Sequence, residues 1–166
     1  MEKWGNTNWW KYLDSTMQEL MSQSLKMMER EEARAALGEK YEDYAFVVFP
    51  AAKAYEGFLK KLFLDLGLIS HQQYNSDHFR IGRALSPSLP KRYRSGWVYS
   101  RLAQFCGGEE LPSEMWEVWK KGRNRTFHFF PHRLGNISLA EAKLVVEEIA
   151  LMMEKTLAGC KINSKY

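Results

Sequence analysis

The sequence feature that constrains the fold most is a helix start near the C-terminal end of the chain. Ser138 is followed three residues later by Glu141, the spacing of a capping box, in which two side chains satisfy the first backbone N–H groups of a helix. The segment 139–149 then carries apolar side chains at the spacing of a helix that packs in a bundle. We therefore predict a helix from Leu139 onward with one face in the core.

Two further long helices are indicated in the first half of the chain. Between Trp9 and Leu37 apolar residues recur every three or four positions, which predicts one long helix that Gly38 ends. Residues 41–66 predict a second helix with a kink at Pro50, because proline removes a backbone hydrogen bond.

Shorter helices are expected at 97–105 and at 112–130, the second ending before Pro131. The segment 70–90 is more polar, and Pro87 and Pro90 mark a loop there, with helical structure within 75–85 as an open alternative. Alternating β and α units are missing, so we predict an all-α fold, a bundle of four to six helices. Residues 1–40 are expected to form an N-terminal helix that packs on a helical domain of residues 41–160. The 166 residues would then form a single compact domain.

Composition favours a folded protein without membrane contact. Apolar residues make up 45% and charged residues 27% of the chain, values typical of globular proteins. The polar residues 6–8 stand where a signal peptide needs an apolar run, so we expect a cytoplasmic location. The two cysteines, Cys106 and Cys160, lie far apart and show no metal-ligand spacing, so we expect two unpaired thiols, no metal site and no other cofactor.

Positive charge is concentrated in two segments that also contain aromatic residues. The net charge is +4, and basic residues interleave with aromatic ones in segments 79–101 and 120–133. Such segments can bind phosphates while their rings stack on unpaired bases. The alternative for each segment is a solvated charged face whose aromatic rings belong to the core.

The residues with the clearest chemistry are Arg123 and His128, near the end of the expected helix 112–130. Histidine can accept or donate a proton near neutral pH, and arginine binds a phosphate through two hydrogen bonds. RNA cleavage needs both abilities, because the 2′-hydroxyl must lose a proton and the charge on phosphorus must be stabilised.

This segment resembles the signature of the HEPN superfamily, an arginine followed by a polar residue, here Asn124, and then a histidine. The family includes many toxin ribonucleases. Its fold is a helical bundle of four or five helices that usually dimerises with its active sites at the interface. The resemblance implies a HEPN-like bundle and a metal-independent endoribonuclease, the toxin of a toxin–antitoxin system or a defence effector.

Residues 51–62 look like the glutamate-bearing helix of RNase LS-type toxins. That resemblance makes Glu56 the matching glutamate and Asp43 the candidate for a matching aspartate. On a straight helix, their separation of thirteen residues advances about 220° beyond whole turns. Asp43 and Glu56 would face nearly opposite sides unless Pro50 bends the helix.

The expected site thus has four catalytic and four RNA-binding residues. The catalytic residues are Arg123, His128, Glu56 and Asp43, and the RNA-binding residues are Asn124, Arg125, Lys120 and Lys121. The expected partners are RNA, a second copy of the chain and an antitoxin protein. The homodimer is inferred from the apolar cluster Phe127, Phe129 and Phe130 beside the site.

Several alternatives stay open at this point. Arg125 and His132 form a second arginine–histidine pair, and His128 can be read as a histidine that only favours the helix end. Arg123 can also be read as a partner that holds two helices together through Glu56. The alternative functions are a non-catalytic HEPN module that binds RNA or nucleotide, and a helical protein-interaction domain.

Overall fold

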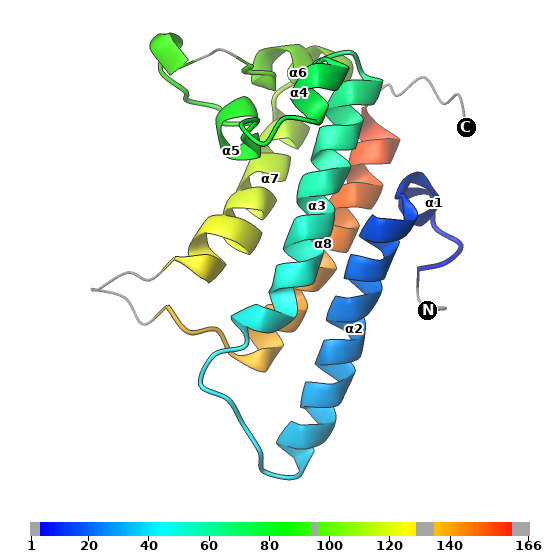
Figure 1. Ribbon diagram of the computed structural model, residues 1–166, viewed down its shortest axis with the longest axis vertical. Helices are drawn as coiled ribbons and strands as arrows, with labels where there is room; N and C mark the ends of the chain where they lie inside the picture. Colours follow the sequence, from blue (N-terminus) through cyan, green and yellow to red (C-terminus); the bar gives the residue numbers. More distant parts are fainter. Residues whose placement is uncertain (1–3, 94–95, 129–134, 161–166) are drawn as a thin grey trace.

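The computed structural model describes residues 4–93, 96–128 and 135–160 of the chain. Within these ranges it contains helices and turns and no strand, which confirms the all-α prediction. The long segments form a bundle (Figure 1): α2 (Ser15–Ala36), α3 (Ala45–Asp65), α7 (Glu110–Trp119) with the π-helix η2 (Lys120–Arg125), and α8 (Leu139–Gly159). The short helices are α1 (Asn8–Tyr12), α4 (His71–Tyr74), α5 (Ile81–Ala84), the 3₁₀-helix η1 (Lys91–Tyr93) and α6 (Tyr99–Phe105).

The bundle is arranged around α3, which contacts α2, α7 and α8. Helices α4 to α6 lie toward the end of the bundle at which α3 ends (Figure 1). Helix α2 packs along α3 and also touches α8, so the N-terminal segment contributes to the same core as the rest of the chain. Across the described ranges, no helix is long and apolar enough to cross a membrane.

Helix α8 begins as the sequence predicts. The Ser138 hydroxyl accepts a hydrogen bond from the Glu141 backbone N–H at 3.2 Å, and the Glu141 carboxylate accepts one from the Ser138 N–H at 2.8 Å. The helix then continues to Gly159 and buries Val146, Ile149 and other apolar residues in the core. The predicted capping box is confirmed.

The first predicted helix is divided in two. Asp14 accepts a hydrogen bond from the Met17 N–H at 2.9 Å and caps α2, while Leu13 is extended and separates α2 from α1. The prediction of one helix from Trp9 was therefore wrong at this point, because an aspartate that caps a new helix interrupts the old one. Gly38, with φ 85°, follows the end of α2 as expected.

Helix α3 continues through Pro50, and a serine of α2 forms hydrogen bonds with its backbone next to the proline. The buried Ser24 hydroxyl donates to the Val47 carbonyl at 2.8 Å and accepts from the Ala51 N–H at 3.0 Å. These two backbone groups would bond to each other in an unbroken α-helix. Ser24 therefore bridges the hydrogen-bond ladder of α3 beside the proline.

The predicted helix 112–130 begins at Glu110 and changes to a π-helix at Lys120. A close approach to α8 accompanies the change. A Cβ at Gly122 would lie 3.3 Å from the Ile149 Cδ1, so only a residue without a side chain fits without displacing that neighbour. The expected stop at Pro131 lies outside the described residues.

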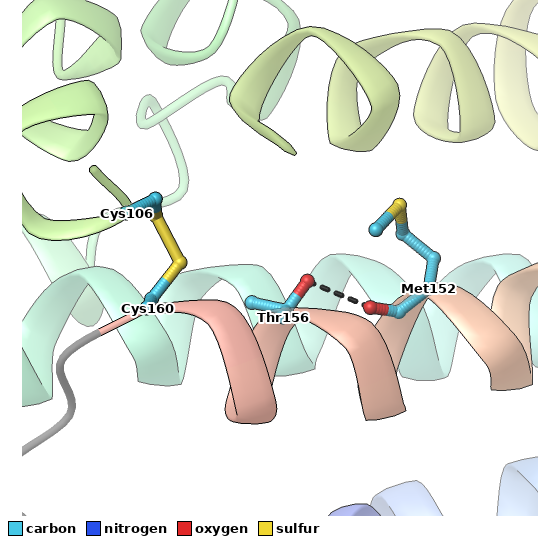
Figure 2. Close-up of a disulfide and its surroundings, with 4 residues drawn as sticks. All are labelled: Cys106, Met152, Thr156 and Cys160. Atoms are coloured by element: carbon cyan, nitrogen blue, oxygen red, sulfur yellow. Dashed lines mark hydrogen bonds between the residues drawn. A yellow bond between two sulfur atoms is a disulfide. The ribbon is translucent and has the colours of Figure 1, made fainter. Parts of the chain in front are cut away.

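The cysteines form a disulfide, which overturns the expectation of two unpaired thiols. Cys106 follows α6 and Cys160 ends α8, and their sulfur atoms are 2.05 Å apart (Figure 2). The two residues are 54 positions apart in the sequence. Only the packing of the helices brings them together, and no spacing rule reveals that pairing.

Candidate active site

The candidate site lies where α7 and η2 end. Arg123 and His128 are exposed and Asn124 is half-buried. On an α-helix, two residues five positions apart point about 140° away from each other. A π-helix has wider turns than an α-helix, so residues within it are less widely separated in direction. Arg123 lies in the π-helix η2, which ends at Arg125, and His128 follows three residues later.

The opposite side of the same segment is anchored in the bundle. Gly122 and Thr126 are buried, and the Thr126 hydroxyl donates to the Lys121 carbonyl at 2.8 Å. Gly122 packs against Ile149 of α8. The backbone that carries Arg123 is therefore fixed from the core side.

An aromatic contact joins the site to α3. The ring of Phe127, the residue before His128, meets the ring of Phe49 edge to face at a centroid distance of 5.3 Å. Phe49 is 50% exposed, and the Lys53 Nζ lies 5.7 Å from its ring centroid. Sequence reasoning missed Phe49, because the run of apolar residues around it does not reveal which one faces solvent.

Glu56 lies on the same face of α3 as Phe49. Seven residues advance about 20° short of two whole turns, a rise of about 10 Å. The Tyr55 hydroxyl donates to the Met115 carbonyl while Phe49 meets Phe127, so α3 and α7–η2 run in opposite directions. Glu56 therefore lies about two turns beyond Phe49 and next to Tyr55, and in the described ranges no ion pair joins it to Arg123.

Asp43 precedes α3, so the helical-wheel argument that placed it opposite Glu56 does not apply. Its carboxylate accepts hydrogen bonds from the backbone N–H groups of Ala45 and Ile137, both at 3.1 Å. These bonds fasten the segment before α8 to the start of α3. In this structure Asp43 holds backbone together.

The predicted RNA-binding residues differ in their surroundings. Lys120 pairs with Glu117 at 2.7 Å, and Lys121 pairs with Glu148 at 2.6 Å. The side chain of Arg125 is outside the described part of the chain, as are the alternative His132 and the residues Phe129 and Phe130. Both lysines would have to leave a carboxylate to bind a phosphate.

In the other basic segment, 79–101, aromatic residues belong largely to the core. Phe79 and Tyr99 are buried, so their rings are not available for stacking on bases. Arg80 and Arg83 line a hollow of about 240 Å³, together with His78 and other residues. The core interpretation therefore holds for these two rings, while the arginines remain at the surface.

The exposed groups of the site can bind an anion and transfer a proton. The Arg123 guanidinium carries a permanent positive charge and His128 offers an imidazole. No three His, Cys, Asp or Glu side chains gather closely enough to hold a metal ion anywhere in the described ranges.

No family model matches the chain, and no curated protein or solved structure matches it either.

Proposed function

We propose that the chain is a metal-independent endoribonuclease of HEPN type, which acts as a toxin or defence effector. The observation that carries this proposal is that Arg123, in η2, and His128, three residues after its end, are both exposed. A permanent cation beside a proton-transfer group suits cleavage of a phosphodiester next to a 2′-hydroxyl.

In the proposed reaction, the imidazole of His128 accepts the proton of the 2′-hydroxyl. The 2′-oxygen then forms a bond to phosphorus, and the bond from phosphorus to the 5′-oxygen breaks. The imidazolium returns the proton to the leaving 5′-oxygen, so no water is consumed. Arg123 stabilises the negative charge that develops on the phosphoryl oxygens, and the products are a 2′,3′-cyclic phosphate and a 5′-hydroxyl.

We propose Glu56 as a residue that orients Arg123 when RNA is bound. It is half-buried on the face of α3 that also carries Phe49, and in the described ranges no hydrogen bond or ion pair engages its carboxylate. Glu56→Gln should therefore lower kcat and leave the protein folded. If the pH profile of kcat/KM changes as well, Glu56 takes part in proton transfer.

The test is cleavage of an end-labelled oligoribonucleotide by the purified chain in EDTA. His128→Ala should slow cleavage about 10²- to 10⁴-fold, and Arg123→Ala about 10²- to 10³-fold. Arg123→Lys keeps the charge but loses the two-point contact, so its cleavage rate should lie between those of the parent and of Arg123→Ala. His71→Ala, an exposed histidine on α4, is the matched control and should cut like the parent.

Loss of cutting in EDTA, or parental cutting by His128→Ala, would contradict this mechanism. RNA binding without cleavage by the parent would favour the non-catalytic module instead. The proposed homodimer predicts a doubled mass in light scattering at micromolar concentration. The proposed toxin predicts that induced expression of the parent, and not of His128→Ala, arrests growth of a bacterial host.

A further inference from the structure

Phe49 presents an aromatic ring to solvent in a defined orientation. The ring is 50% exposed, yet it is held edge to face by Phe127 and lies beneath the Lys53 ammonium. A single exposed apolar residue is common on protein surfaces. A ring fixed by two neighbours can receive a flat group without first losing rotational freedom.

This ring lies beside the candidate site. Its partner Phe127 directly precedes His128, and the ring centroids of the two phenylalanines are 5.3 Å apart. With about 3.8 Å between consecutive Cα atoms, Phe49 and His128 are close enough to contact adjacent parts of one bound strand. Phe127 thus links the ring to the reacting groups.

Lys53 adds an available positive charge one helical turn further along α3. It is exposed, and no carboxylate pairs with it among the residues the structure describes. Lys120 and Lys121, by contrast, are each engaged by a glutamate. Lys53 can therefore bind a phosphate without breaking an existing ion pair.

We infer that Phe49 and Lys53 form a subsite for an unpaired nucleobase and its neighbouring phosphate. The base stacks on the Phe49 ring, and the Lys53 ammonium binds the phosphate. A base inside a duplex cannot offer its face, so the subsite selects single-stranded RNA. The claim that this subsite selects the RNA strand to be cut rests on the proposed ribonuclease function. The claim that it binds an unpaired base does not.

The test measures binding separately from cleavage. The probe is a fluorescent single-stranded oligonucleotide with 2′-O-methyl riboses, which lack the attacking hydroxyl, and anisotropy gives its Kd for the full chain. Phe49→Leu keeps an apolar side chain without a ring and should bind about 5- to 150-fold more weakly, the range for loss of one stacked base. Phe49→Trp should bind at least as tightly as the parent.

Three further variants test the role of Lys53 and the specificity for the Phe49 ring. Lys53→Ala should weaken binding and reduce the slope of log Kd against log salt by about one contact, while Lys53→Arg should retain both. Tyr41→Ala removes another exposed aromatic ring, 49% exposed, and should leave Kd unchanged. A duplex probe should bind the parent and Phe49→Leu equally.

The outcomes separate the subsite from the reaction. If Phe49→Leu binds the probe with the same Kd as the parent, the subsite proposal is overturned. If that variant also changes its oligomeric state, the Phe49 ring contacts a second copy of the chain instead. If Phe49→Leu weakens binding but the parent cuts no RNA, the subsite stands and the ribonuclease proposal fails. If the parent cuts RNA and Phe49→Leu cuts with unchanged kcat/KM, the subsite fails alone.

Discussion

Replacement of Ser24 by alanine should destabilise the protein well beyond the loss of one ordinary surface hydrogen bond. The Ser24 hydroxyl bonds the Val47 carbonyl and the Ala51 N–H, and all three residues are fully buried. Each buried backbone group left without a partner costs about 1–3 kcal/mol. The helix cannot simply close the gap, because the ring of Pro50 crowds the preceding turn.

We therefore expect Ser24→Ala to lower the free energy of unfolding by about 2–4 kcal/mol. For a chain of this size, that corresponds to a fall in Tm of about 5–15 °C. Urea unfolding followed by circular dichroism, with the disulfide intact, measures it. Ser22→Ala on the same helix is the control and should change stability by less than about 0.5 kcal/mol.

A double-mutant comparison with Pro50→Ala tests whether the role of Ser24 depends on the proline. Pro50→Ala restores an N–H and removes the ring, so α3 can form its own hydrogen bond between Val47 and Ala51. Ser24→Ala should then cost at least about 1 kcal/mol less in the Pro50→Ala background. Equal costs in both backgrounds, or no cost in either, would refute the bridging role of Ser24.

Three further predictions concern packing and pH. Gly82→Ala should destabilise the fold by about 1–3 kcal/mol, because the added Cβ would lie 2.5 Å from the Trp119 ring. A urea unfolding midpoint equal to the parent's would contradict this prediction. Burial raises the pKa of Tyr55 well above its ordinary value. The contribution of Tyr55 to the free energy of unfolding is therefore complete below about pH 10, and it is lost as the pH rises further, because the phenol then ionises in the unfolded chain first. Stability of the parent relative to Tyr55→Phe should therefore decline between pH 9 and 11, and a constant difference would count against it. Hydrogen bonds from the backbone and hydroxyl of Ser138 lower the pKa of Glu141, so this cap stabilises above about pH 4.3 and weakens as the pH falls through the lowered value. Tm should consequently fall more steeply in acid for the parent than for Glu141→Gln, whose amide does not titrate.

Local signals predicted the parts of the fold that depend on neighbours in sequence. The capping box at Ser138 located α8, and Gly38 located the end of α2. Asp14 carried a similar signal that was missed, since an aspartate followed by a helical run marks a new helix start. Such features can be read from the sequence because both partners lie within one turn.

Features that depend on another helix could not be predicted in this way. The role of Ser24 requires α2 and α3 to be packed, and the π-helix at Gly122 accompanies the approach of α8. Arg123 and His128 are exposed, and the convergence of both with Glu56 in one cleft stays a prediction. Nothing local distinguishes the exposed Phe49 from its buried neighbours.

The stability that the disulfide contributes depends on the compartment in which the chain is located. The disulfide closes a loop from Cys106 to Cys160, which contains Arg123, His128 and all of α8. A loop of 54 residues corresponds to about 4 kcal/mol of lost unfolded-state entropy. Glutathione and thioredoxin keep most cytosolic thiols reduced, so a cytoplasmic location would remove this contribution. In an oxidising compartment, a protease that cut once within the loop would leave both fragments covalently joined. We therefore expect the resistance of the fold to unfolding to depend on the redox conditions around the protein.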